Sequence, residues 1–145
     1  MLARVVENVY WLSRYMERAE NTARIINVNA HLLLDLPKGI APGWLPLVDI
    51  SGNRAEFDAK GTKTEERDVV HFLVADPENP GSLFSSLRMA RENARTLREI
   101  LPTEAWEMLN EFHSDFMREL PTGLAKRARF RFLNDVVGNL QKISG

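Results

Sequence analysis

Apolar residues recur every three or four positions over the first part of the chain, and no glycine or proline interrupts them before Pro37. The residues of this stripe are Leu2, Val5, Val9, Leu12, Met16, Ala19, Ala23, Ile26, Ala30 and Leu34. Such spacing is typical of one side of a helix, so the sequence predicts a long helix from residue 2 to about residue 36. Four further apolar residues lie on the opposite side: Tyr10, Ile25, Val28 and Leu32. Because both sides carry apolar residues, we expect this helix to lie in the centre of the fold.

The rest of the chain shows the same helical period, interrupted by proline and glycine. Helices are expected at residues 64–76, 80–101, 103–120 and 124–140. The last of them should bury Phe130, Leu133, Val137 and Leu140. Residues 37–61 are rich in Gly, Pro, Asn and Asp and should form a long connection with one local helical turn. No segment has the pattern of a strand, so we predict an all-α bundle of about five helices in one domain, residues 1–145.

Charge and composition narrow the possible functions. Nineteen Lys and Arg residues face twenty Asp and Glu residues, and this near balance disfavours general nucleic-acid binding. The absence of cysteine excludes disulfides, zinc–thiolate sites and thiol nucleophiles. No run of about eighteen apolar residues occurs, and charge appears too early in the amino-terminal segment for a secretory signal. We therefore expect a cytoplasmic protein that does not span a membrane.

A polar cluster on the first predicted helix is the main candidate for a binding site. Its members recur on adjoining turns of one side: Arg14, Glu17, Arg18, Asn21 and Arg24. One interpretation is a solvated face with weak ion pairs. The other is a partly buried network, favoured by the apolar residues that alternate with these charges, whose guanidinium groups could hold a carboxylate or phosphate. Glu20 is expected to project elsewhere, toward the edge of the apolar stripe.

Other polar groups give weaker indications. Four arginines lie opposite the apolar stripe of the 80–101 helix, where a solvated face and an anion-binding face are both possible: Arg88, Arg91, Arg95 and Arg98. Basic residues at the start of the last helix are expected to be solvated: Lys126, Arg127, Arg129 and Arg131. The three histidines have no metal-binding spacing, and no catalytic serine arrangement or glycine-rich phosphate loop occurs. We expect neither a metal site nor a bound cofactor.

Several separated segments of the chain resemble the bacterial alpha-E family, and they occur in the same order. They comprise residues 2–12, 14–24, 79–82, 90–95 and 101–110. In this resemblance the name-giving Glu-Arg pair corresponds to Glu17 and Arg18. The residues flanking that pair are Arg14, Glu20, Asn21 and Arg24, and the second motif corresponds to Asn79, Ser82, Arg91, Asn93 and Arg95.

The family resemblance implies a helical domain that acts beside ATP-grasp ligase-like and transglutaminase-like proteins thought to make or modify peptides. It also implies a full domain about twice this length, of which this chain would be the first half. Our leading hypothesis is an accessory, non-catalytic module that docks with the ligase or holds an anionic substrate group. One alternative is an enzyme of peptide or amide modification that uses Glu17 or Glu20 as acid or base beside arginines. Another is a structural fragment in which two chains pair and cover each other's exposed faces.

Overall fold

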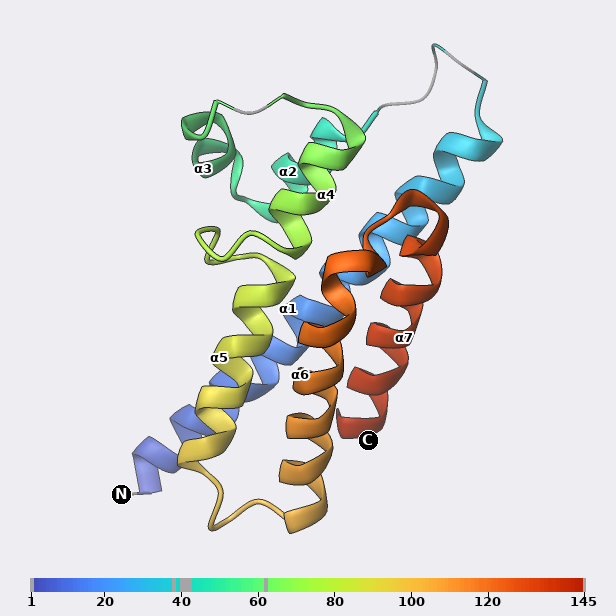
Figure 1. Ribbon diagram of the computed structural model, residues 1–145. Coiled ribbons are helices and arrows are strands. Elements are labelled where there is room, and N and C mark those ends of the chain that lie inside the picture. The colour runs from blue at the N-terminus through green and yellow to red at the C-terminus, as the bar shows by residue number, and fades with distance from the viewer. Residues whose placement is uncertain (1, 38, 40–42, 62, 145) are drawn as a thin grey trace.

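The computed structural model describes residues 2–37, 39, 43–61 and 63–144, and within them the chain forms seven helices and no strand (Figure 1). The helices are α1 (Leu2–Asp35), α2 (Leu45–Ser51), α3 (Arg54–Ala59), α4 (Glu66–Val74), α5 (Leu83–Thr96), α6 (Thr103–Gly123) and α7 (Lys126–Ser144). The all-α class and the long amino-terminal helix are confirmed. None of the described helices is long and apolar enough to cross a membrane.

The long helix α1 contacts α2, α4, α5 and α7. In Figure 1 it runs obliquely behind α5 and α6, while α2, α3 and α4 gather near the upper end of α5. Its middle is buried through Met16, Ala19, Ala23 and Ile26. Three of the four apolar residues on its opposite side, expected to be covered, are exposed within this chain: Tyr10, Val28 and Leu32 are 54%, 57% and 46% accessible. The fourth, Ile25, is partly buried against the core.

Small residues dominate where α1 packs against α5. Ala19 and Ala23 on α1 are fully buried, as are Ala90 and Ala94 on α5. Side chains at a helix contact set the distance between the helix axes, so alanines allow these two helices to approach closely. This contact fixes the polar side of α1 relative to the turn that precedes α5.

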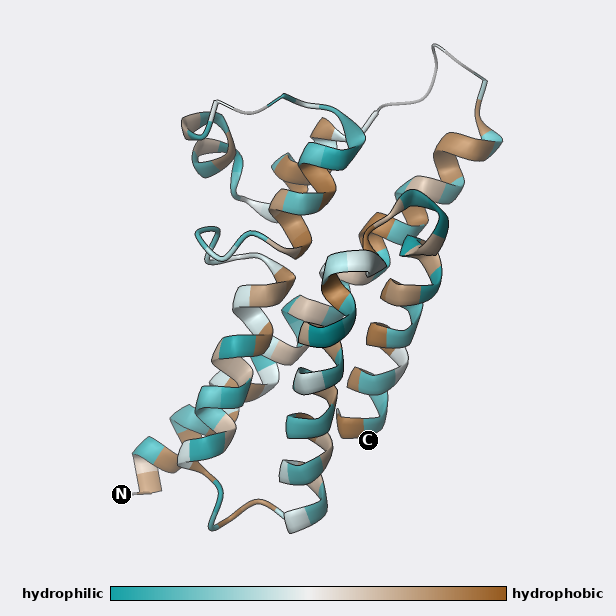
Figure 2. Cartoon of the chain, in the orientation of Figure 1, coloured by the Kyte–Doolittle hydropathy of each residue, from teal (hydrophilic) through white to brown (hydrophobic). Residues whose placement is uncertain are grey.

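An aromatic cluster joins α6 and α7. Phe116 is 2% exposed, and its ring lies 5.6 Å from the ring of Phe132 in a stacked arrangement. Gly123 ends α6 beside the same ring, where a Cβ atom would lie 2.6 Å from Phe132. Figure 2 shows hydrophobic and hydrophilic residues alternating along α6 and α7, as expected for helices with one buried side.

The expected core of the last helix is correct for three residues and wrong for Phe130. Leu133, Val137 and Leu140 are buried, but Phe130 is 48% exposed and packs against His31 at the edge of α1. Phe132 and Val136 are buried instead. The buried side of α7 is therefore rotated relative to the expected one, because the helix packs on both α1 and α6.

Several helix boundaries differ from the expectation, among them the start of α5 at Leu83 instead of residue 80. The 37–61 connection contains two short helices, α2 and α3, instead of one local turn. Phe57 anchors α3, because its ring packs against the ring of Phe72 with 5.0 Å between the ring centres. The helix α5 ends at Thr96, and the following residues form turns. The helix α6 continues through Pro121 to Gly123. Proline removes only one backbone donor, and near a helix end this loss is tolerated.

Candidate functional site

A groove of about 550 Å³ lies between α1, the corner where α2 meets α3, and the turn before α5. We call it the α1 groove. Six of its lining residues come from α1: Arg14, Glu17, Arg18, Asn21, Thr22 and Ile25. Opposite them stand Ile50, Ser51, Asn53, Pro80 and Gly81. The groove thus brings together the Glu17-Arg18 pair and the 79–82 segment, which are more than sixty residues apart in the sequence.

The turn before α5 is built around a buried asparagine. The amide Nδ2 of Asn79 donates to the carbonyl oxygen of Phe72 (2.9 Å), and its Oδ1 accepts from the backbone N–H of Gly81 (3.0 Å). Ser82 then caps α5, because its Oγ accepts from the backbone N–H of Ser85 (3.0 Å). Asn79 and Ser82, both suggested by the family resemblance, therefore have structural roles that hold Pro80 and Gly81 at the groove.

The opposite wall of the groove includes a close contact between the turn before α5 and a side chain of the α2–α3 corner. A Cβ atom added at Gly81 would overlap the side-chain amide of Asn53. The absence of a side chain at Gly81 leaves the space that the Asn53 amide occupies. Gly52 makes the corner possible, since it ends α2 with a φ of 80°, a left-handed conformation that other residues rarely adopt.

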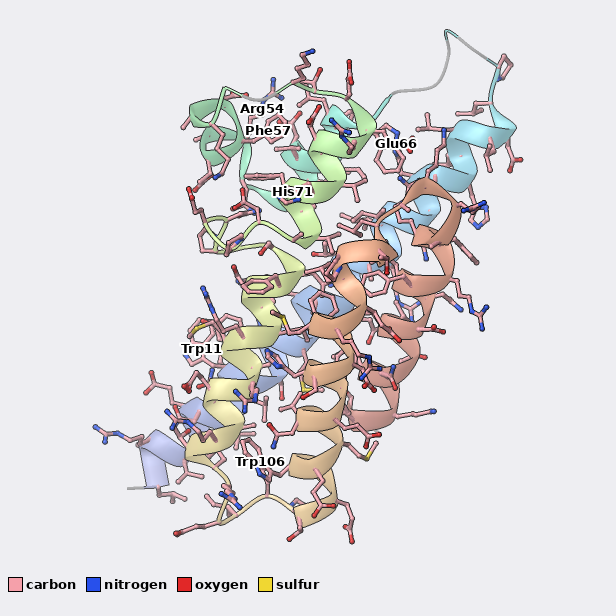
Figure 3. The ribbon with its side chains drawn as sticks, in the orientation of Figure 1. Trp11, Arg54, Phe57, Glu66, His71 and Trp106 are labelled. Atoms are coloured by element: carbon pink, nitrogen blue, oxygen red, sulfur yellow. The ribbon has the colours of Figure 1, made fainter. Side chains whose placement is uncertain are left out.

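The α2–α3 corner is further held by an arginine clamp. Arg54 donates from Nη1 to Asp49 at 2.9 Å and from Nε to Asp58 at 3.1 Å. These hydrogen bonds, first to Asp49 and then to Asp58, raise the pKa of Arg54. Figure 3 labels Arg54 together with Phe57, the buried anchor of α3. Arg54 thus joins α2 to α3 and stabilises the groove wall that carries Asn53.

The charged residues of α1 that line the groove are exposed. Arg14 Nη1 lies 3.7 Å from Glu17 Oε2, and the two side chains are 50% and 59% accessible. The guanidinium of Arg18 lies 5.5 Å from the centre of the Tyr15 ring. Within the described residues Arg18 has no ion pair. The structure therefore agrees with a solvated face and not with a buried network, although this face forms one wall of a groove.

Arg24, the remaining member of the first cluster, and Glu20 lie outside the α1 groove. Arg24 Nε pairs with Glu20 Oε2 at 2.9 Å. Glu20 lines a second, largely apolar cavity of about 470 Å³. This cavity lies between α1, the carboxyl end of α5, the amino-terminal part of α6 and the carboxyl end of α7. Glu17 borders both cavities. The two glutamates that the sequence offers as acid or base therefore both line the second cavity, whereas only Glu17 lines the α1 groove.

The second cluster does not join the first. Arg91 Nε donates to Asn110 Oδ1 of α6 at 2.8 Å, and Arg95 pairs with Glu92 at 3.0 Å. The amide of Asn93 donates to the carbonyl oxygen of Met89 in its own helix. Burial, with a smaller contribution from the charge of Arg91, lowers the pKa of the neighbouring His113. Arg91 therefore connects α5 to α6, and none of the three lines the α1 groove.

Sequence reasoning missed several residues and misjudged one. Thr22, Ser51 and Asn53 line the α1 groove without any motif that distinguishes them. Arg129, expected to be solvated, is 7% exposed; its Nη1 lies 2.9 Å from Glu66 Oε2, and its guanidinium lies 5.0 Å from the centre of the Trp44 ring. The alternation of apolar and polar residues along α7 could not reveal that Arg129 is buried, because Trp44 and Glu66, which contact it, are distant in sequence.

Across the described parts of the chain, no group of three or more His, Asp or Glu residues is arranged to hold a metal ion.

Comparison with known proteins identifies one family. The model of the Alpha-E family, described as "a predicted alpha-helical domain with a conserved ER motif", matches residues 1–145. Uncharacterized proteins of Mycobacterium bovis and of two strains of Mycobacterium tuberculosis are 28% identical to this chain over 120 residues. The match covers 73% of this chain but 14% of each relative's length. No solved structure matches the chain.

The chain contains two Glu-Arg pairs, in different surroundings. Glu17 and Arg18 line the α1 groove, whereas Glu66 and Arg67 stand at the start of α4. Figure 3 labels Glu66 at that position. Since Glu66 is engaged by the buried Arg129, its pair has a structural role. Glu66 and Arg67 line a separate cavity of about 520 Å³ between α4 and the start of α7, whereas the Glu17-Arg18 pair lines the α1 groove.

Proposed function

The chain belongs to the Alpha-E family, and we propose that it is an accessory, non-catalytic helical module for an ATP-grasp-type ligase. In this proposal the ligase makes or modifies peptides or amide bonds, and a transglutaminase-like protein belongs to the same system. The α1 groove holds an anionic group of the substrate. One observation carries the proposal: Arg14 and Arg18 are exposed in a groove that also contains Asn21.

The groove arginines are available for a ligand. Arginine offers paired donors in a planar arrangement that matches a carboxylate. Arg18 makes no ion pair within the described residues, and the Arg14–Glu17 pair is long at 3.7 Å. Exposed pairs of this kind contribute at most about 1 kcal/mol. An incoming carboxylate can therefore replace Glu17 as the partner of Arg14 at little cost.

The surroundings of Glu17 support binding over catalysis. A general acid or base needs a neighbour that fixes its position and tunes its protonation. Glu17 is 59% accessible, and Arg14 is its ion-pair partner. Glu20 also lines the second cavity with Glu17, but its carboxylate is already engaged by Arg24 at 2.9 Å.

Removing the two groove arginines tests this proposal. We expect the double variant Arg14→Gln, Arg18→Gln to lower ligase turnover about tenfold or more, because a charge-assisted hydrogen bond contributes roughly 1.5–3 kcal/mol. Turnover would be measured with the purified ATP-grasp-type ligase and saturating amounts of this chain. The variant should fold normally, since exposed positions rarely affect stability by more than about 0.5 kcal/mol.

The matched control replaces two arginines outside the α1 groove, Arg118→Gln and Arg131→Gln. Both are exposed, and the change in net charge is the same as in the test variant. We expect this control to leave ligase turnover unchanged. Equal turnover with the groove variant and with the wild-type chain would contradict the proposal, as would a ligase that neither binds nor responds to this chain.

A second candidate function, a structural homodimer, is favoured by the exposed outer side of α1. Tyr10, Val28 and Leu32 are each about half exposed along one side of this helix, and such apolar side chains are often covered by a partner. If two chains pair through this side, light scattering at micromolar concentration should give twice the mass of one chain. The double variant Val28→Lys, Leu32→Lys should then give the single mass. A wild-type chain that is already monomeric would rule out the dimer.

A further inference from the structure

We propose that the group held in the α1 groove is the carboxyl terminus of a peptide whose last side chain is aliphatic. This inference rests on the proposed function and narrows the anionic group to one chemical class. Three properties of the groove lining lead to it: its net charge, its apolar wall and its side-chain amides.

The charge of the lining favours a ligand with one negative charge. Arg14 and Arg18 contribute two positive charges and Glu17 one negative charge, which leaves an excess of one. A terminal carboxylate matches this excess. A phosphoryl group carries about 1.5 to 2 negative charges near neutral pH and would be repelled by Glu17. The carboxylate of Glu17 can instead accept a hydrogen bond from a peptide N–H of the ligand.

The wall opposite α1 contains two apolar residues, Ile50 and Pro80, and we call it the apolar wall; Ile25 adds a third apolar side chain on α1. Ile50 is 69% exposed. Covering such a side chain with an aliphatic group of the ligand removes apolar surface from water on both partners. The volume of about 550 Å³ also exceeds what a lone carboxylate would fill and lies within the range of sites that hold larger ligands.

Side-chain amides stand on both walls of the groove. Asn21 comes from α1 and Asn53 from the α2–α3 corner. Each amide offers both a donor and an acceptor, the combination that the N–H and C=O groups of a peptide require. The hydrogen bond of Asn53 to the carbonyl oxygen of Ser51 is long at 3.4 Å, so this amide can turn to a ligand. A fatty acid or a simple carboxylic acid would leave these amides unused.

Calorimetric titration with four probes tests the inference. The probes are N-acetyl-Gly-Gly-Leu, its carboxyl-terminal amide, N-acetyl-Gly-Gly-Ser and inorganic phosphate. We expect the leucine peptide to bind about tenfold more tightly than its amide, which lacks the charge. It should also bind at least about fivefold more tightly than the serine peptide, which lacks the aliphatic group. Phosphate should bind more weakly than the leucine peptide.

Two variants separate the charged wall from the apolar wall. Arg18→Gln should weaken the leucine and serine peptides by the same factor. Ile50→Ser should abolish the preference for leucine and keep the requirement for a free carboxylate. Ile100→Ser is the matched control, because Ile100 is also an exposed isoleucine, at 60%, and does not line the α1 groove. This control should bind all four probes as the wild-type chain does.

The possible outcomes distinguish this inference from the proposed function. If the leucine and serine peptides bind equally and both depend on Arg18, the aliphatic specificity is wrong while anion binding remains. If phosphate binds more tightly than either peptide, the assignment of a peptide carboxyl terminus is wrong, while anion binding remains. If no peptide binds, the inference is wrong, and the ligase assay with the Arg14 and Arg18 variant decides separately whether the proposed function is wrong as well.

Discussion

Replacing Phe116 with alanine is expected to lower the free energy of unfolding by about 4 kcal/mol. Phe116 is 2% exposed, and the centre of its ring lies 6.5 Å from that of Phe112 and 5.6 Å from that of Phe132. The substitution removes a large apolar side chain and both ring contacts from the interface of α6 and α7. The backbone at Gly123 already lies against Phe132, so the surrounding structure has little freedom to close the cavity.

Urea unfolding followed by circular dichroism measures this loss. The control is Met117→Ala, which truncates the next residue of the same helix, where the side chain is 40% exposed. We expect the control to change stability by less than about 1 kcal/mol. A loss at Phe116 no larger than at Met117 would show that the aromatic cluster does not hold α6 and α7 together.

Arg129→Ala is expected to cost about 3 kcal/mol of unfolding free energy. The side chain of Arg129 is 8% accessible, pairs with Glu66 at 2.9 Å and lies over the Trp44 ring. Alanine removes the ion pair, the cation–π contact and the packing of the arginine stem at once. We place the loss at the lower end of the range for buried pairs, because Glu66 is 28% accessible and water can solvate it after the change.

The matched control for Arg129 is Arg131→Ala, two residues further along α7 and exposed. Thermal unfolding should show a clear decrease in Tm for Arg129→Ala and almost none for Arg131→Ala. Glu66→Gln should give an intermediate decrease, because it removes the negative charge but keeps the side-chain volume. If both arginine variants unfold at the wild-type temperature, the Arg129 network contributes nothing to stability.

The fold was predictable from the sequence wherever one helix determines its own buried side. The stripe through Met16, Ala19, Ala23 and Ile26 repeats at the helical period and is buried as expected. At the ends of α1 the burial predicted from the same period was wrong, since Leu2 and Leu34 are 78% and 81% exposed. Periodicity indicates which side of a helix can be buried, and only the neighbouring helices decide how far along its length burial extends.

Features that depend on contacts between distant segments were not predictable. The sequence around Phe57 contains Gly, Asn and Asp and suggests a loop, yet packing against Phe72 stabilises α3. Arg129 belongs to a run of basic residues, and Trp44 and Glu66 bury it from two other parts of the chain. In both cases tertiary contacts outweighed the local pattern.

The candidate site was predicted in part. The residues proposed on α1 that share the α1 groove are Arg14, Glu17, Arg18 and Asn21. Arg24 was separated from them by its pairing with Glu20, an interaction at four-residue spacing that competes with any ligand. Asn53 could not be found from the sequence, because it reaches the groove through contact between the α2–α3 corner and the distant turn at Gly81.

An amide NMR titration of the isotope-labelled chain with N-acetyl-Gly-Gly-Leu tests the central claim, that the α1 groove is the ligand site. The signals of Asn21, Asn53 and Gly81 should move and reach saturation, while those of Arg129 and Asn139 should stay in place. The Arg14→Gln, Arg18→Gln variant should show no such movement. Shifts that arise elsewhere on the chain, or that persist in this variant, would contradict the account.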